Sequence, residues 1–477
     1  MSRRPINFAL LVASLVFLAN IPWSSQSKAA VVFQPNQITV TYLNPTLAGT
    51  SAAILRTPPS NPNAHIGIFV MHSFAGYVNF TACTALAQRG YTTLCADTVF
   101  ANRHHEYKGF EDHAPAITAG IGYLRNNVPG ITKVILFGHS MGAPMMAFYD
   151  NIQENGVAAC LAPARIIGCD TTNLVDASGK SKLLAVDGVI LFDAHLGDAF
   201  ATFTYVDPAI KNPDKPQLRN ELVDMFDPRN GYPHDDNEGS PNFRSAEYSD
   251  EFIQRFLQAQ ANRNADILLE ARRLWADIQA GNKGYYRDDM PFIVPGSEGA
   301  ARLWQADLSL LKCTKDPHIF LAHDGIQNPS RGPVCSVRPP SASAAGDQSI
   351  DSVIHSTVRV WLGAHALRTN GLYRQTTNDI TGIDYDSSNT NTVTAVKGIT
   401  KPFLLVANSG HYFVVPDEII FNNVKSADKT FAIEEGSVHG GGECTACEKA
   451  LGLPSGYFGD TNRRTYDFMD QWLSSRF

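Results

Sequence analysis

The chain has 477 residues and a formal net charge of −7, from 39 basic and 46 acidic side chains. A mildly acidic chain repels nucleic acid, and the sequence contains neither a basic run with interleaved aromatics nor a glycine-rich phosphate loop. Nucleic acid and nucleotides are therefore excluded as natural partners, and small or uncharged substrates fit better.

The first 29 residues have the pattern of a signal peptide. Arg3 and Arg4 precede an apolar core at residues 8–18, and small residues follow at Ser27 and Ala29. Removing residues 1–29 takes away Arg3, Arg4 and Lys28 and no acid, so the formal charge becomes −10. No other stretch approaches the roughly 18 apolar residues that a membrane helix needs. The sequence predicts an exported protein, secreted or periplasmic, without an integral membrane segment after signal removal.

Short apolar runs alternate with helical patterns through residues 30–197, which favours a mostly parallel sheet with helices on both faces. The nearly continuous apolar character of residues 66–71 and 134–137 is typical of strands covered on both faces. The predicted strands are residues 38–42, 50–56, 66–71, 92–96, 134–137 and 188–192, and the predicted helices are residues 79–88, 114–125 and 144–153.

Gly138, His139, Ser140, Met141 and Gly142 lie between an apolar strand and a helix-prone stretch. Glycine on both sides allows a strand-to-helix turn so tight that the serine stands exposed at the strand tip. This pattern predicts that Ser140 is a nucleophile.

The alternation stops after Gly197 and resumes at residues 403–406 and 430–434, followed by a closing helix at residues 463–475. Residues 198–397 are therefore expected to form an insertion. Its most regular part, residues 250–280, has apolar side chains at helical spacing. Residues 339–351 and 376–391 are rich in Ser, Thr, Asn, Asp and Pro and are expected to be loops or hinges.

Eight cysteines in an exported chain suggest disulfides. Their spacing offers three local pairs, Cys160 with Cys169, Cys313 with Cys335 and Cys444 with Cys447. Cys83 falls on a predicted helix and Cys95 in a predicted strand, where a free buried thiol is the ordinary outcome.

The serine motif after one strand and a histidine, His439, after the last strand give the chain a resemblance to the α/β-hydrolase superfamily, and to its serine esterases in particular. The resemblance covers residues 31–197 and 398–477. It implies a fold of the α/β class, with a mostly parallel sheet flanked by helices, a serine turn after strand five and a histidine after strand eight. It also implies that residues 198–397 form a largely helical cap inserted after strand six.

The resemblance assigns roles to individual residues. Ser140 corresponds to the nucleophile and His439 to the base that takes its proton. Two main-chain N–H groups, those of Phe74 and Met141, correspond to the oxyanion hole. Ser73 stands where the family usually has glycine, and His72 is expected to be a structural histidine that bonds the main chain.

The third member of the triad is an acid, and its usual position is empty. The loop after strand seven holds residues 407–411, which include no carboxylate, and Asp417 lies further on, beyond Pro416. Some family members carry the acid at the tip of strand six instead, where this chain has Asp193. We predict Asp193 as the acid; the alternatives are Asp417 and the absence of an acid.

The loop after the fourth strand concentrates polar side chains, namely His104, His105, Glu106, Asp112 and His113. A metal site is conceivable there, but the spacing fits no familiar ligand template. A solvated polar loop is the preferred interpretation, so no metal site is expected.

The resemblance predicts hydrolysis of a carboxylic ester through an acyl-enzyme intermediate, without a cofactor and with a small-molecule ester as the substrate. Because this fold supports several chemistries, lactonase, amidase and acyltransferase activities remain alternatives. A degenerate, non-catalytic binding protein is a further alternative. The sequence does not indicate an oligomeric state.

Overall fold

The structure is a computed structural model, and it describes residues 32–233, 244–282, 289–297, 302–339 and 352–477. The predicted signal peptide, residues 1–29, lies outside the described residues, as does nearly all of the predicted loop at 339–351. Within the described part of the chain, no helix combines the length and the hydrophobicity that crossing a bilayer requires.

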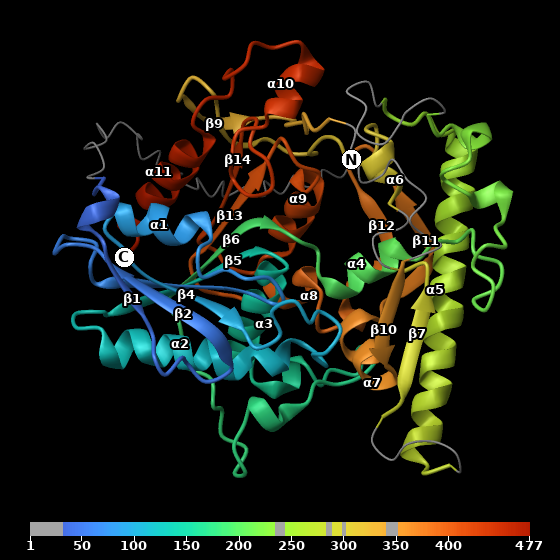
Figure 1. Cartoon of the computed structure of the whole chain (residues 1–477), viewed down its shortest axis with the longest axis horizontal. Helices are drawn as coiled ribbons and strands as arrows, with labels where there is room; N and C mark the ends of the chain where they lie inside the picture. Colours follow the sequence, from blue (N-terminus) through green and yellow to red (C-terminus); the bar gives the residue numbers. More distant parts are fainter. Residues whose placement is uncertain (1–31, 234–243, 283–288, 298–301, 340–351) are drawn as a thin grey trace, which may run out of the picture.

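The described residues form one ten-stranded sheet that runs through the molecule (Figure 1). Its interior strands are parallel, whereas β1, β2 and β9 run antiparallel to their neighbours. The strands in spatial order are β1 (Thr39–Tyr42), β2 (Thr50–Thr57), β4 (Thr92–Thr98), β3 (Ile66–His72), β5 (Lys133–Ser140), β6 (Gly188–Ala194), β13 (Phe403–Asn408), β14 (Lys429–Glu434), β8 (His318–Leu321) and β9 (Gln327–Arg331).

Successive residues of the central strands face opposite layers of the core. In β3, Ile68 and Val70 pack in the cluster that includes Leu86 and Trp472, while Phe69 packs in the other large cluster. This alternation is the period-two pattern of a strand buried on both faces, and it explains why β3 is almost continuously apolar.

Helices cover both faces of the sheet. In Figure 1, α1 (Thr81–Gln88) and α11 (Thr461–Ser474) lie on one side, and α2 (Ala114–Asn127) and α3 (Gly142–Asn155) lie on the other. The remaining α-helices outside residues 198–397 are α9 (Val414–Asn423) and α10 (Thr445–Leu451). The six strands and three helices predicted for residues 30–197 are all present, with ends that differ by a few residues.

The segment expected as an insertion contains more strands than the sequence suggested. Its longest element is α5 (Asp250–Gln279). The N-cap residue Ser249 precedes it, and the Ser249 side chain accepts a hydrogen bond from the N–H of Phe252. Beside α5 lie two small sheets, β7 (Pro291–Pro295) with β10 (Val353–Thr357) and β11 (Arg368–Gln375) with β12 (Ile380–Asp384) (Figure 1). β12 lies within residues 376–391, which were expected to be a loop. The segment's other α-helices are α4 (Asp198–Tyr205), α6 (Leu303–Ala306), α7 (Val358–Val360) and α8 (Thr392–Val396). It also contains the π-helical turn η8 (Trp361–His365) and the 3₁₀ turns η5 (Glu221–Val223), η6 (Pro228–Asn230) and η9 (Tyr385–Ser387).

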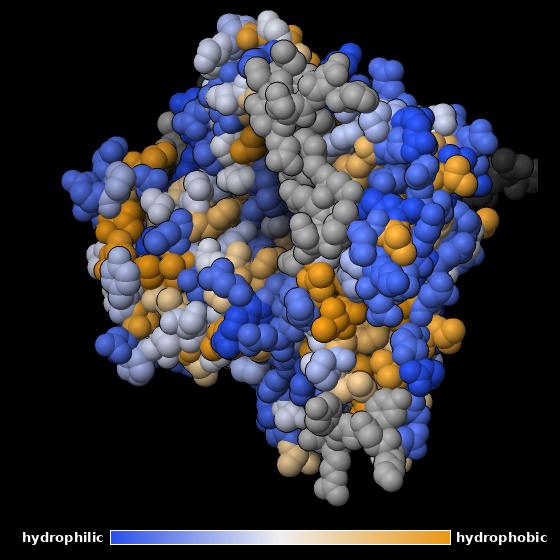
Figure 2. All heavy atoms as spheres, turned by 45° about the vertical axis from the view of Figure 1, so that its right-hand side comes forward, coloured by the Kyte–Doolittle hydropathy of each residue, from blue (hydrophilic) through white to orange (hydrophobic). Residues whose placement is uncertain are grey.

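Part of this segment belongs to the main sheet. β8 pairs in parallel with β14, and β9 extends the sheet beyond β8. Residues 318–331 therefore continue the core sheet, although they lie within the segment 198–397 that was expected to form a cap. The division of the chain into core and cap stays a prediction. The face that carries α5 is mostly hydrophilic, with hydrophobic side chains in separate small patches (Figure 2).

All eight cysteines lie in the described residues and are joined in four pairs. The pairs Cys160–Cys169, Cys313–Cys335 and Cys444–Cys447 match the spacing-based prediction. The expectation of free thiols at Cys83 and Cys95 was wrong. Helix α1 packs on β4, which brings the Cα atoms of these two residues within 6.3 Å, close enough for a disulfide.

Candidate active site

Ser140 stands at the turn between β5 and α3, as the glycine-flanked motif predicts. Its φ of +54° lies in the left-handed region, which a non-glycine residue adopts only where the surrounding structure enforces it. A Cβ on Gly138 would stand 2.6 Å from Cα of Ala143, and one on Gly142 would stand 2.7 Å from the carbonyl oxygen of Met71. Glycine is required on both sides of Ser140 because α3 begins so close to the ends of β5 and β3.

Asp193 is the extra residue of a β-bulge at the tip of β6. In the register between β5 and β6, His139 faces Phe192 and Ser140 faces Ala194, so Asp193 has no residue opposite. Its φ is +43° and its side chain is fully buried. Bulges next to active sites re-aim a side chain, and this one lies beside the turn that carries Ser140.

The carboxylate of Asp193 is hydrogen-bonded to His439. Oδ2 lies 2.5 Å from Nδ1 of His439, and Oδ1 accepts a 3.2 Å hydrogen bond from the main-chain N–H of Asn408. Burial alone would raise the pKa of Asp193, but the neighbouring His411 and His439 outweigh it and hold the pKa below the usual value. The carboxylate is therefore ionised at neutral pH, the state that can orient an imidazole and stabilise an imidazolium.

A second imidazole, that of His411, contacts the same carboxylate oxygen. Its Nδ1 lies 2.8 Å from Oδ2 of Asp193, and its ring stacks on that of His439 with centroids 4.3 Å apart. Burial lowers the pKa of His411 to about 4, so this ring is neutral at neutral pH. No sequence motif marked His411 as a site residue. The available signal was its place in the loop after β13, where the acid usually stands.

Asp417, the alternative acid, lies in α9 and does not hydrogen-bond His439. Its Oδ1 accepts a 3.0 Å hydrogen bond from the main-chain N–H of Ala194. Burial, with the negative charge of Asp193 nearby, raises the pKa of Asp417 well above its usual value. Asp417 is thus held in its neutral, protonated form beneath the ionised Asp193.

A chain of hydrogen bonds fixes the main chain of His439. Nε2 of His139 lies 2.6 Å from the carbonyl oxygen of His439, and Nδ1 of His139 lies 2.5 Å from the hydroxyl of Tyr77. Burial holds the pKa of His139 well below the usual value, so its ring carries one proton. Because a carbonyl only accepts, that proton is on Nε2, and Tyr77 donates to Nδ1. The loop that carries His439 is therefore hydrogen-bonded to His139, the residue before Ser140.

The two N–H groups predicted to form the oxyanion hole differ in their surroundings. Met141 is the N-cap of α3, in the first turn of a helix, where main-chain N–H groups have no partner within the helix. The N–H of Phe74 donates to Nδ1 of His72 at 3.2 Å, and that of Ala75 donates to the same atom at 3.0 Å. His72 is buried and accepts both bonds, in agreement with the expected structural role.

The polar side chains of the loop after β4 contact different partners and do not form one cluster. Glu106 pairs with Arg103 at 3.1 Å near the surface, and Asp112 accepts a 2.6 Å hydrogen bond from the main-chain N–H of Lys108. His104 instead points away from these two acids, toward a buried aspartate at the start of α4. The residues of this loop do not converge on one point, but His104 joins a cluster built from distant segments.

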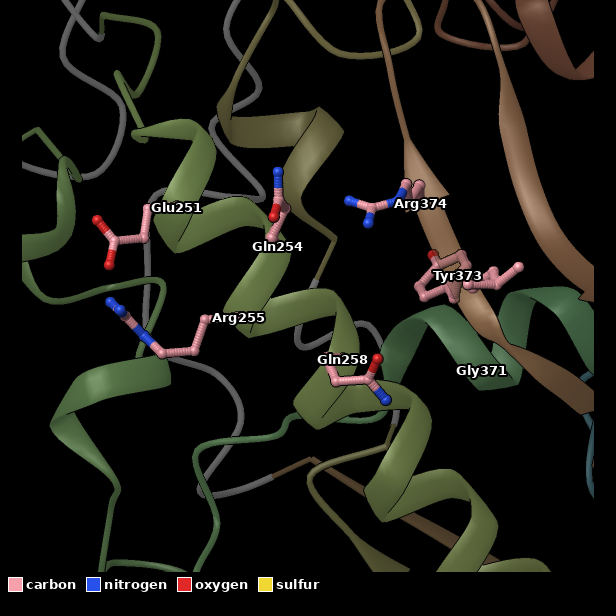
Figure 3. Close-up of a pocket in the computed structure, with 8 residues that line it drawn as sticks. Glu251, Gln254, Arg255, Gln258, Gly371, Tyr373 and Arg374 are labelled. Carbon is pink, nitrogen blue, oxygen red and sulfur yellow. The ribbon is translucent and has the colours of Figure 1, made fainter.

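A surface pocket of about 370 Å³ lies within the segment 198–397, between α5 and β11. Glu251, Gln254, Arg255 and Gln258 line it from α5, and the side chain of Arg374 extends toward α5 from β11 (Figure 3). The lining is polar and includes none of the predicted catalytic residues, so this pocket is separate from the residues around Asp193.

No protein family and no curated protein matches the sequence. Several solved structures follow a similar course of the main chain. Est1E from Butyrivibrio proteoclasticus is 12% identical over 91% of this chain and 99% of that one, with a TM-score of 0.35. A monoglyceride lipase from Saccharomyces cerevisiae is 12% identical over 95% and 98%, with a TM-score of 0.35. Brefeldin A esterase is 10% identical over 92% and 77%, with a TM-score of 0.38. Similarity at this level says nothing about substrate.

The strand order of the sheet assigns the fold. Counted across the sheet from β1, the fifth strand is β5, which ends at Ser140, and the eighth is β14, which precedes His439. The six strands that are neighbours in the order β4, β3, β5, β6, β13 and β14 are parallel. Helices cover both faces of the sheet, and Ser140 stands on a strained strand-to-helix turn. The chain therefore has the α/β-hydrolase fold.

Proposed function

We propose that the protein is a serine hydrolase that cleaves a carboxylic ester through an acyl-enzyme intermediate. One observation carries the proposal: the buried, ionised carboxylate of Asp193 is hydrogen-bonded to Nδ1 of His439, at the strand tip beside Ser140. An imidazole held in this way has its second nitrogen available as a general base.

The proposed reaction has two halves. Oγ of Ser140 attacks the ester carbonyl while Nε2 of His439 takes the hydroxyl proton, and the imidazolium then protonates the departing alcohol. In the second half His439 takes a proton from a water molecule that attacks the acyl carbon, the bond from that carbon to Oγ breaks, and the imidazolium returns the proton to Oγ of Ser140 as the carboxylic acid leaves. Asp193 stays ionised throughout and stabilises the imidazolium, and the lowered pKa of this carboxyl supports that role.

The developing negative charge needs two N–H donors. We assign them to Met141 and Phe74. The position of Met141 in the first turn of α3 supports its assignment, since N–H groups there point out of the helix. The N–H of Phe74 would have to be shared between His72 and the substrate, or released from His72 when substrate binds.

We propose further that the substrate is a small, uncharged ester and that the protein acts outside the cytoplasm. The acidic balance of the chain and the segment 198–397 beside the sheet support a restricted, neutral substrate. The four cysteine pairs support an oxidising compartment, because disulfides persist mainly in exported proteins.

Turnover of aryl esters of increasing acyl length by the purified protein tests the proposed activity. We expect saturable hydrolysis that falls as the acyl chain becomes bulky, and its loss in His439→Gln. Absence of ester, lactone and amide turnover in a folded wild-type protein would contradict the proposed function.

A further inference from the structure

Three side chains that can bind a metal meet outside the proposed triad. His104 comes from the loop after β4, Asp198 is the first residue of α4, and His365 ends the π-helical turn η8. One nitrogen or oxygen atom of each lies within 4.8 Å of the corresponding atoms of the other two. Nε2 of His104 is 2.9 Å from Oδ1 of Asp198, and Nδ1 of His365 is 3.5 Å from the same oxygen.

The cluster is enclosed. The side chains of Asp198 and His365 have no exposed surface, and that of His104 is 20% exposed. The ring of His105 lies against both histidines, with centroids 4.6 Å from His104 and 5.5 Å from His365. Two imidazoles therefore contact one buried carboxylate, and a third imidazole packs against both of them.

A bound cation would stabilise the buried carboxylate of Asp198. A fully buried carboxylate is costly unless positive charge accompanies it. Among the ion pairs of the described residues, Asp198 meets histidines only, with no lysine or arginine. The hydroxyl of Tyr107 donates to its other oxygen, Oδ2. The described contacts of the carboxylate are thus two imidazole nitrogens and one phenol, and no lysine or arginine supplies a permanent positive charge.

The spacing fits a small divalent ion. Zinc binds histidine nitrogen and carboxylate oxygen at about 2.0–2.2 Å, so two ligand atoms of a tetrahedral site stand roughly 3.3 Å apart. The observed separations from Oδ1 of Asp198, 2.9 and 3.5 Å, lie on either side of that value. Tyr107 acts on the carboxylate as outer-shell partners do in metal sites, by fixing its orientation. Thr202 Oγ1, 3.2 Å from Nδ1 of His365, is the contact that a metal ion would displace.

We propose that the protein binds one divalent transition-metal ion, best matched by Zn²⁺, through Nε2 of His104, Oδ1 of Asp198 and Nδ1 of His365, with water as the fourth ligand. The ion would join the β4 loop of the core to two elements of the segment 198–397. The ring of Phe74 packs on that of His104 with centroids 4.1 Å apart, so the ion would also steady the loop that carries Phe74. This role is structural and does not depend on the proposed ester hydrolysis.

The test measures metal directly. Untagged protein is stripped with a chelator, dialysed, and titrated with Zn²⁺ and with Co²⁺, whose visible absorption reports tetrahedral nitrogen and oxygen ligands. We expect one ion per chain by elemental analysis, a cobalt spectrum typical of a four-coordinate site, and a higher melting temperature with zinc.

Three variants and a control locate the site. His104→Gln and Asp198→Asn should lose stoichiometric binding, and Tyr107→Phe should weaken it by about 10- to 100-fold, as loss of an outer-shell partner does. His323→Gln removes a histidine paired with Glu435 elsewhere and should bind like the wild type. Absence of tight uptake by stripped wild type would overturn the proposal, and so would unchanged uptake by folded His104→Gln. Metal uptake by the stripped wild-type protein tests the proposal even if Asp198→Asn fails to fold.

Discussion

Nδ1 of His439 lies 2.5 Å from Oδ2 of Asp193, although the two residues stand 246 positions apart in the chain. The contact depends on the bulge at the tip of β6, where Asp193 is the unpaired residue between Phe192 and Ala194. It also depends on the bond between His139 and the carbonyl of His439, which holds the loop after β14 against β5. The proposed acid and base are thus positioned by the ends of the central strands.

Asp193 and Asp417 are predicted to behave oppositely when each is changed to asparagine. Asp193→Asn removes the charge that orients His439, and we expect turnover to fall by about 10⁴, as the same change does in a serine-protease triad. Asp417→Asn replaces a carboxyl that is already neutral, so turnover at neutral pH should stay close to wild type. Steady-state kinetics of both variants, with circular dichroism to confirm folding, show which of the two residues is the triad acid. The reverse ranking would move the acid to Asp417.

A pH-dependent effect on stability is expected at Glu111. This side chain is buried, and burial raises its pKa to about 7, although a 2.9 Å hydrogen bond from the N–H of Asp170 to Oε1 partly offsets the rise. The ordinary pKa of glutamate is about 4.3. Between these values the folded state keeps a proton that the unfolded state has lost, so stability falls as pH rises through this range.

Glu111→Gln should remove that loss. The variant and the wild type should melt at similar temperatures near pH 4.5, and the variant should melt higher at pH 8.5. The difference in free energy of unfolding at the higher pH should be roughly 3 kcal/mol, because the pKa of Glu111 is raised by about 2.5. Melting curves at both pH values measure it. Equal differences at the two pH values would show that Glu111 is not held protonated.

The cysteine pairing is expected to hold in the purified, non-reduced protein. Peptide mapping under non-reducing conditions should recover Cys83 joined to Cys95, in addition to Cys160 with Cys169 and Cys313 with Cys335. Reduction should release each pair and lower the melting temperature, since a disulfide constrains the unfolded chain. Alkylation of Cys83 and Cys95 in denatured but non-reduced protein would contradict this pairing.

Local patterns predicted the parts of the structure that local chemistry controls. The strand and helix positions of residues 30–197 follow from periodicity, and the turn at Ser140 follows from Gly138 and Gly142. The tight approach of α3 to Met71 explains why glycine is needed there. Asp193 stood out because its position at the end of a buried apolar run is itself a local feature.

Other features depend on contacts between segments that are distant in the sequence. Local sequence patterns do not predict such contacts. The placement of His411 on the carboxylate of Asp193 requires the loop after β13 to turn back toward β6. The pair Cys83–Cys95 requires α1 to pack on β4. The cluster of His104, Asp198 and His365 requires three segments to converge, so the spacing of histidines within one loop could not reveal it.

Covalent labelling of Ser140 tests the central proposal most directly. A fluorophosphonate reacts with an activated serine, and peptide mapping identifies the modified residue. We predict one label per chain on Ser140, together with loss of both labelling and ester turnover in a folded Ser140→Ala variant. Removal of a triad serine costs several powers of ten in rate. Label on another residue, or turnover by Ser140→Ala within about tenfold of wild type, would contradict the proposed mechanism.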